Sequence, residues 1–288
     1  MYTNNQHLMK VKDRDVLLHF GLATAKDNFE DMFGDVKFVC SGGSMNRMKS
    51  LAALISKELN ISSELCNLCS TDRYVLYKVG PVLTVSHGMG MPSTTIMLHE
   101  IIKLLQYAKC KDVKFFRIGT CGGLSLEPGT LIVTGTAVDY KFEPVFEQQI
   151  LGKIVSTSTT FDKDLAKELL LCKDDSEKFE MVIGNTMSTN DFYEGQARLD
   201  GAFCDYTEED KMKYLHAAYD AGVKNIEMEA LCIASMMNRA GMSAAVLCVS
   251  LLDRLKGDEA ATSTKDLNDW QKRPLTIVTR YIKSKLEK

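Results

Sequence analysis

The segment FYEGQARLDG (192–201) combines side chains that neither a core nor a solvated loop requires: a ring at Phe192, an amide at Gln196 and a guanidinium at Arg198. A Gln amide offers a donor and an acceptor in one plane, and an Arg adds further donors. Uracil presents an acceptor, a donor and an acceptor along one edge, so the amide can pair with N3–H and O2 while the guanidinium donates to O4. With Phe192 stacked on the ring, the segment predicts a pocket for a flat nucleobase such as uracil.

Two glycine-rich turns could hold an anion. In the first, Gly43 precedes a predicted helix whose N-terminus favours negative charge, and Arg47 adds a fork suited to phosphate. A plain tight turn with a surface Arg would have the same sequence. In the second, Arg117 lies near the predicted end of an apolar strand, where an unpaired guanidinium is costly. Because Thr120 and two glycines follow, we favour an anion ligand there over a buried Arg–carboxylate pair.

Two further motifs are less specific. Glu227 and Glu229 lie two residues apart across a strand end. Residues two apart share a face only while a strand continues, so where this strand ends we expect the two side chains to point oppositely. Glu227 would then meet a structural partner, while Glu229 would face the cleft, where a carboxylate suits a ribose diol. Helix N-terminal acids, favoured by the dipole, are the simpler interpretation of these residues alone. The stretch SHGMGMPS (86–93) matches a dinucleotide fingerprint only partly, which leaves a nicotinamide-dependent oxidoreductase as a remote alternative.

The composition is that of a soluble globular protein. The chain has 288 residues, of which 45% are hydrophobic and 25% charged, and its formal net charge is -3. Lys and Arg are spread along the chain, which speaks against a nucleic-acid surface. No apolar run approaches the ~18 residues that span a bilayer, and the N-terminal stretch lacks the apolar core of a signal peptide. We therefore expect no nucleic-acid partner and no membrane association.

Cysteine usage indicates a reducing compartment. The nine cysteines are odd in number, and several lie within apolar runs, as reduced thiols of a cytoplasmic protein do. Cys66 and Cys69 form a single CxxC pair with no second pair, so no zinc site is predicted.

Strands and helices alternate through most of the sequence, which indicates one α/β domain over residues 1–288. The expected fold is a mixed central β-sheet flanked by helices on both faces. In such sheets, ligands gather at the loops beyond the carboxyl ends of the strands, where the candidate residues occur. A helix near the C-terminus carries Pro274, which predicts a kink or break. The predicted strands are 36–40, 73–79, 82–86, 113–118, 130–139, 180–186, 224–229 and 243–252, and the predicted helices are 45–59, 93–108, 162–172, 207–222, 230–241 and 265–286.

Four motifs together resemble a known family. GGSMNR, RIGTCGG, NDFYEGQARLDG and NIEME, in that order and spacing, resemble the uridine phosphorylases of the nucleoside phosphorylase family, in particular their eukaryotic, dimeric branch. The resemblance extends from LLHFGL, near the N-terminus, to the final helix. It implies a single-domain nucleoside phosphorylase-like fold. The implied activity is that of a pentosyltransferase in pyrimidine salvage: reversible phosphorolysis of uridine to uracil and ribose 1-phosphate.

The resemblance also implies roles for individual residues on the phosphate and ribose side. Inorganic phosphate is the expected co-substrate, and no metal or organic cofactor is expected. Arg47, Arg117 and Glu229 are expected to carry catalysis. The expected phosphate ligands are Gly43, Arg47, Arg117, Thr120 and, from the neighbouring subunit, Arg73. The expected ribose contacts are Thr120, Met228, Glu229 and, from the neighbouring subunit, His19.

On the base side the resemblance implies contacts to uracil and stabilisation of its leaving anion. A homodimer with shared active sites is implied as well, in which residues 1–30 contribute to the partner's site. The expected uracil contacts are Phe192, Gln196, Arg198, Cys121, Gly122 and Arg254.

Some positions depart from the family pattern. Cys121 stands where many relatives carry Ser or Thr, and a thiol is a weaker donor. Asp253 stands where uridine phosphorylases carry Asn and purine nucleoside phosphorylases carry an acid. This keeps a purine-type phosphorylase, or a 5′-thioadenosine nucleosidase, as an alternative, although Gln196 with Arg198 argues for a pyrimidine. Tyr74 follows Arg73 in place of a Glu, so we predict no monovalent cation at the interface.

A catalytically inert nucleoside-binding paralogue is the alternative from another functional class. Such a protein would be expected to have lost a phosphate-binding Arg or the base-reading Gln. The chain retains Arg47, Arg73, Arg117, Gln196 and Arg198.

Overall fold

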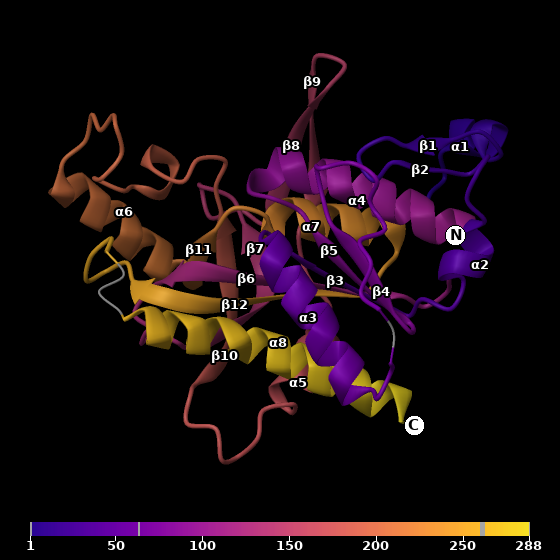
Figure 1. Ribbon diagram of the computed structural model, residues 1–288. Helices are drawn as coiled ribbons and strands as arrows, with labels where there is room; N and C mark the ends of the chain where they lie inside the picture. The colour runs from indigo at the N-terminus through magenta and orange to yellow at the C-terminus, as the bar shows by residue number, and fades with distance from the viewer. Residues whose placement is uncertain (1, 63, 260–262, 288) are drawn as a thin grey trace. The chain divides into compact units, whose positions relative to one another are not determined.

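The computed structural model describes residues 2–62, 64–259 and 263–287 (Figure 1). Its contacts divide the chain into two compact units. The first unit comprises Met1–Arg117, Met236–Ala244 and Ile282–Lys288, and the second comprises Ile118–Ser235 and Ala245–Tyr281. Strand β6 (Lys114–Gly123) begins in the first unit and ends in the second.

The sheet of the first unit has the strand order β6–β3–β5–β4. β3 (Phe38–Gly42) pairs in parallel with β5 (Val82–Ser86) and with the start of β6. β3 and β5 are buried along their whole length, as expected of parallel strands covered on both faces. β4 (Leu76–Val79) joins β5 as the antiparallel hairpin predicted across Gly80.

Helices α3 (Met45–Glu58) and α4 (Gly90–Tyr107) follow β3 and β5 along the chain. α3 begins at the cap of Ser44, whose side chain accepts a hydrogen bond from the N–H of Arg47. Its buried residues, Met48, Leu51, Ala52 and Ile55, recur at helical spacing, and the helix was predicted over residues 45–59. The N-terminal elements were not predicted, and they are α1 (Gln6–Val11), β1 (Val16–Leu17), β2 (Leu22–Ala23) and α2 (Phe29–Phe33).

The sheet of the second unit is mixed, with the order β11–β10–β7–β12–β6. β10 (Met181–Ser188) pairs in parallel with both β7 (Leu131–Val138) and β11 (Val223–Glu227). β12 (Ala244–Asp253) runs antiparallel to β7. The α/β class and the mixed sheet predicted from the sequence are confirmed.

Four helices, α5 (Lys163–Leu170), α6 (Glu208–Asp220), α7 (Ala230–Ala240) and α8 (Thr264–Leu286), connect or follow these strands. α6 follows a cap at Thr207, the first residue of the predicted helix, and Thr207 forms a capping box with Asp210. The core beneath α6 contains Leu124, Val138, Met187, Leu215 and Ile226. Among the described residues, no helix is both long and apolar enough to cross a bilayer.

A kink or break was predicted at Pro274, and the break does not occur, because α8 continues through that residue. A proline removes one helical hydrogen bond. The apolar residues that follow it, Leu275, Ile277 and Val278, are buried, and their packing holds the helix together despite that loss.

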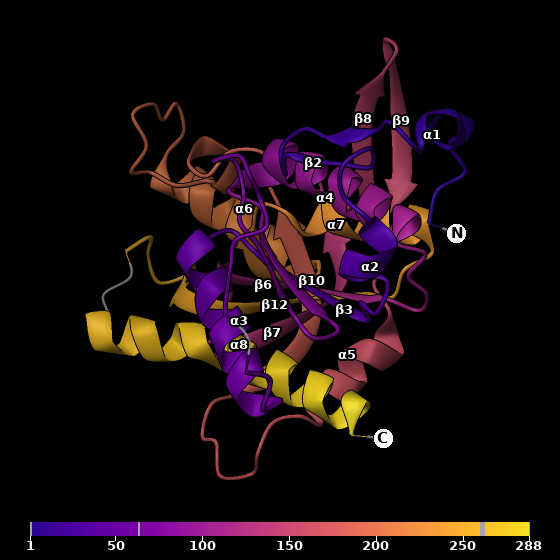
Figure 2. The ribbon, with the colours of Figure 1, turned by 45° about the vertical axis from the view of Figure 1, so that its right-hand side comes forward.

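An unpredicted hairpin of strands β8 (Val145–Ile150) and β9 (Lys153–Ser158) extends away from the sheet of the second unit (Figure 2). Its tip turns through Leu151 and Gly152, which have φ angles of 50° and 75°. Both angles are left-handed, as two-residue hairpin turns require.

Candidate active-site residues

The segment predicted to read the base follows β10 and contains the short 3-10 helix η1 (Glu194–Gln196). Arg198 forms a two-pronged ion pair with Asp200, with Nε–Oδ1 and Nη2–Oδ2 distances of 2.9 and 2.7 Å. Its guanidinium carbon lies 4.6 Å from the centre of the Phe192 ring. The hydrogen bonds to Asp200, opposed by partial burial, raise the pKa of Arg198. The ring and the guanidinium therefore hold each other in place.

Gln196 is buried, with 4% of its surface exposed. Its backbone carbonyl accepts a hydrogen bond of 2.6 Å from Arg254 Nη2. Among the residues that the structure describes, its side-chain amide makes no hydrogen bond. The amide atoms are not among the fully buried side-chain atoms that lack a partner, so they keep access to solvent, and a ligand can pair with them there.

Arg254 is almost fully buried, at 1% exposed, and its Nε donates to Asp258 Oδ1 over 2.9 Å. Burial lowers the pKa of Arg254, and the Asp258 carboxylate opposes that effect. Within the described part of the chain, Arg254 Nη1 has no hydrogen-bond partner. A Cβ added to Gly122 would lie 2.7 Å from Arg254 Cγ, so only glycine leaves room for this side chain.

Strand β6 is longer than predicted. The strand was expected to end at residue 118, with a glycine-rich loop after it, but β6 runs on to Gly123. Gly122 and Gly123 extend the strand because they pair antiparallel with Ile226 and Asn225 of β11. Thr120 and Cys121 are therefore strand residues, as Gly122 is.

Cys121 is 7% exposed. Burial, helped by the neighbouring Cys248 thiol, raises the pKa of the Cys121 thiol well above its ordinary value. The thiol is therefore protonated at neutral pH, and it is not a thiolate nucleophile.

Of the two acids at the end of β11, Glu227 has the structural partners that were predicted for it. The Glu227 carboxylate accepts the N–H of Glu229 at 2.9 Å, the N–H of Ala230 at 2.9 and 3.1 Å, and the hydroxyl of Ser188. Glu227 thus caps α7 and has a structural role. Glu229 is 5% exposed, and Met228 lies between the two acids. Their contacts to ribose stay a prediction.

In the first unit, Gly43 lies between β3 and α3, and a Cβ at this position would meet the carbonyl oxygen of Gly88 at 2.7 Å. The turn at Gly43 therefore packs closely against the backbone of Gly88, in the stretch SHGMGMPS (86–93). Arg47 is half-buried in the first turn of α3. Arg117 is 4% exposed and pairs in register with Ser41 of β3.

His19 is fixed by Glu100, a residue that the sequence analysis missed. The Glu100 carboxylate lies 2.7 Å from His19 Nδ1, and it also accepts the backbone N–H groups of His19 and Phe20. Glu100 is 7% exposed on the apolar face of α4, and an acid within such a face was the signal that could have found it.

Arg73 is held much less firmly than His19. Its side chain is 72% exposed, and its Nε lies 3.8 Å from Asp72 Oδ1, on a side chain that is itself 93% exposed. An exposed pair at this distance contributes little to stability. The role of either residue in a neighbouring subunit stays a prediction.

Asp253, the residue behind the purine alternative, forms hydrogen bonds within its own chain. It is 6% exposed, and its Oδ1 accepts the N–H of Ser125 at 3.0 Å and the N–H of Leu255 at 3.1 Å. Its Oδ2 lies 3.4 Å from Lys256 Nζ. The carboxylate therefore closes the turn after β12.

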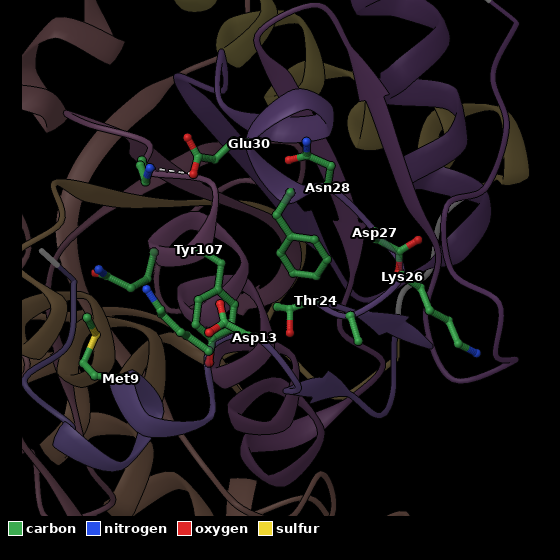
Figure 3. A pocket seen from close by; sticks show the side chains of 13 residues that line it. Met9, Asp13, Thr24, Lys26, Asp27, Asn28, Glu30 and Tyr107 are labelled. Carbon is green, nitrogen blue, oxygen red and sulfur yellow. Dashed lines mark ion pairs between the residues drawn. The ribbon is translucent and has the colours of Figure 1, made fainter.

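The first unit also contains a cavity of about 580 Å³ (Figure 3). It is lined by N-terminal residues such as Asp13 and Asn28 and by the end of α4, and an ion pair of 2.6 Å joins Lys109 to Glu30 at its edge. The predicted site residues, all of which the structure describes, do not line it. Among the described residues, no cluster of three or more His, Cys, Asp or Glu could hold a metal ion.

Comparison with known proteins identifies the family of the chain. A sequence profile of the phosphorylase superfamily matches residues 37–283. Uridine phosphorylase 1 of Mus musculus is 51% identical over 287 residues, which cover 98% of this chain and 92% of that protein. The inactive uridine phosphorylase B of Schistosoma mansoni is 41% identical and covers 97% of this chain and 95% of its own length.

Solved structures agree with these relatives. The crystal structure of uridine phosphorylase from Schistosoma mansoni in complex with uracil has a TM-score of 0.93 at 42% identity, and the match covers 97% of this chain and 98% of that one. With half of its residues shared over nearly its full length, the chain belongs to the uridine phosphorylase family, a pentosyltransferase family within the phosphorylase superfamily.

Proposed function

We propose that this protein catalyses the reversible phosphorolysis of uridine to uracil and ribose 1-phosphate, with inorganic phosphate as co-substrate. The bond between uracil N1 and ribose C1′ breaks, its electron pair stays on uracil, and a phosphate oxygen bonds to C1′. The uracil anion then takes up a proton and leaves. We assign this reaction to pyrimidine salvage in the cytoplasm, without a metal or an organic cofactor.

One observation carries the assignment of the base. The Gln196 amide makes no hydrogen bond to the described part of the chain although the residue is only 4% exposed, and it lies in the segment that also carries Phe192 and the fixed Arg198. Arg254, which donates to the carbonyl of Gln196, keeps a further donor at Nη1. Donors and an acceptor of this kind match the edge of uracil, and they stabilise the charge that builds on O2 and O4 as the bond breaks. Cys121 and Gly122 complete the proposed base contacts.

We assign phosphate binding to the backbone of Gly43, the hydroxyl of Thr120 and the guanidinium groups of Arg47 and Arg117. The Gly43 turn at the start of α3 offers N–H groups and the positive end of a helix dipole. A guanidinium holds phosphate through paired hydrogen bonds. Phosphate bound in this way brings a nucleophile whose negative charge stabilises the cationic ribose of the transition state.

We further propose a homodimer in which each subunit lends residues to its partner's site. Arg73 supports this proposal because its own chain leaves it exposed and weakly paired. His19, oriented by Glu100, is the proposed contact to the ribose 5′-hydroxyl of the partner's substrate. Met228, Glu229 and Thr120 are the proposed ribose contacts from the same chain.

Asp253 bears on the purine alternative. A general acid for a purine needs a carboxyl that can face N7, whereas this carboxylate accepts two backbone N–H groups and lies near Lys256. This arrangement supports a pyrimidine substrate over a purine.

The test is a phosphate-dependence assay with uridine, deoxyuridine, thymidine and inosine. We expect uracil to be released from uridine only when phosphate or arsenate is present. Faster turnover of inosine than of uridine would overturn the assignment of substrate. Uridine binding without any turnover would place this protein with the inert relatives instead.

A further inference from the structure

We infer that Asp258 and Lys211 are positioning residues that hold the base-reading segment (192–201) in its working geometry. This inference rests on the proposed function. Neither residue was a candidate from the sequence, and neither is proposed to touch the nucleoside. Each acts through another side chain or through the backbone of the segment.

Asp258 meets the base-reading side of the second unit at several points. Its Oδ1 accepts Arg254 Nε at 2.9 Å, and Arg254 in turn donates 2.6 Å to the carbonyl of Gln196. The backbone carbonyl of Asp258 accepts a hydrogen bond of 2.9 Å from Arg198 Nη2. The side-chain Oδ2 of Asp258 lies 3.4 Å from the backbone nitrogen of Leu199. Asp258 thus contacts both arginines assigned to the base and the backbone of the base-reading segment at Leu199.

Lys211 supplies the opposing charge from α6. Its Nζ lies 2.7 Å from Asp258 Oδ2, and the side chain is only 5% exposed. A lysine buried to this degree is rare unless it is paired, and removing one partner of a buried pair leaves the other charge uncompensated. Lys211 therefore fixes Asp258 in the position from which Asp258 fixes Arg254 and Arg198.

The charges of this cluster do not cancel. Lys211, Arg198 and Arg254 bring three positive charges, and Asp200 and Asp258 bring two negative ones, which leaves one net positive charge. Burial would raise the pKa of Asp258, but Lys211 and Arg254 outweigh it and hold that pKa below its ordinary value. The acid thus stays ionised at neutral pH. A fixed net positive charge beside the base favours the anion that uracil becomes as it leaves.

The experiment compares two substitutions in the full-length enzyme. Lys211→Met keeps the apolar stem of the side chain and removes its charge, while Asp258→Asn keeps the shape and weakens both ion pairs. For each we expect kcat/KM for uridine to fall about 10- to 100-fold, with a higher KM for uridine, because the base-reading groups lose their alignment. The KM for phosphate is expected to stay within about twofold, and uracil is expected to bind more weakly in calorimetry.

A matched control is Arg280→Met, which breaks the 2.7 Å pair between Arg280 and Glu177 elsewhere in the second unit. This variant is expected to keep the wild-type KM for uridine. The double variant Lys211→Met/Asp258→Asn should lose less than the product of the two single losses, because each single change leaves a buried partner unpaired.

The outcomes separate this inference from the proposed function. Wild-type protein without phosphate-dependent cleavage of uridine would refute the proposed function itself. Active wild-type protein whose Lys211→Met and Asp258→Asn variants keep the KM for uridine and the affinity for uracil, and lose only melting temperature, would show that the cluster merely stabilises the fold. That result would overturn the inference.

Discussion

Arg198 and Arg73 are both assigned to ligand binding, but they differ in how firmly their own chain holds the side chain. Arg198 is paired through two hydrogen bonds to Asp200, packs over Phe192 and donates to the carbonyl of Asp258. Arg73 is in the first unit, with 72% of its side chain exposed, and its ion-pair partner among the described residues is Asp72, at 3.8 Å. The arginine assigned to the base is held before any ligand arrives, whereas the described part of the chain holds Arg73 only weakly.

The two arginines differ in what fixes their side chains before a ligand binds. A guanidinium fixed in advance loses little conformational entropy when it binds, whereas a free side chain loses up to about 2 kcal/mol. The base-reading segment is therefore complete within one chain. Arg73 needs a further surface to fix it, and in the proposed dimer the partner and its phosphate provide that surface.

The largest expected effect tests the base-reading segment. Gln196→Leu should cost about 2–4 kcal/mol of transition-state stabilisation, roughly a 30- to 900-fold loss of kcat/KM for uridine, because the uracil edge loses its partner. Steady-state kinetics measure this loss. Gln149→Leu, at an exposed position of β8, is the control. Normal turnover by Gln196→Leu would refute the account of base recognition.

The next effect tests the exposed arginine. Arg73→Ala should raise the KM for phosphate about 10- to 100-fold, the value of a charge-assisted hydrogen bond, and leave the melting temperature within about 1 °C. If Arg73 acts in the partner's site, mixing this variant with Gln196→Leu under subunit exchange restores roughly a quarter of wild-type activity, because each mixed dimer has one intact site. No recovery in mixtures whose exchange is verified would place Arg73 in its own subunit's site.

A smaller effect is expected at Asp253. Asp253→Asn weakens the acceptor for the N–H groups of Ser125 and Leu255, so unfolding should become easier by about 1 kcal/mol. The ratio of uridine to inosine turnover should change by less than about threefold, because the carboxylate is engaged within the chain. Denaturant unfolding and the two assays measure both quantities. A large gain or loss of inosine turnover would reinstate the purine interpretation.

The smallest effect concerns the pH dependence of the Arg198–Asp200 pair. The hydrogen bonds from Arg198 lower the pKa of Asp200 below 3.8. The contribution of the pair to stability is thus fully present above pH 3.8 and is lost as the pH falls through the lowered value. Asp200→Asn should lower the melting temperature by about 1–3 °C at neutral pH, and this difference should shrink in acid. A difference that grew in acid would contradict the assigned pair.

The sequence predicted those parts of the fold that follow local patterns. Apolar runs located the buried strands, and the helices predicted to start at residues 45 and 207 start at Met45 and Glu208. The hairpin of β8 and β9 was missed because its residues are largely exposed, so no apolar pattern marks it. The extension of β6 was missed because glycines are typical of loops, although Gly122 and Gly123 pair with β11 here.

The candidate residues divide in the same way. Motifs and resemblance pointed to Gln196 and Arg198, but no local pattern links Lys211 to Asp258, which are 47 residues apart in the chain and 2.7 Å apart in space. Glu100 and Asp258 are acidic residues that hold other side chains in place, but the sequence around each of them carries no motif that marks this role. Only the folded chain reveals which neighbours they hold.

The contact between Gly122 and Arg254 has a consequence for protein engineering. A Cβ at position 122 would lie 2.7 Å from Arg254 Cγ and 2.9 Å from its Cδ, so any larger side chain there must displace the arginine. The carbonyl of Gln196 would lose its donor in the same step. Positions 122 and 254 therefore form one unit of design, and a library intended to alter the accepted base must randomise both together.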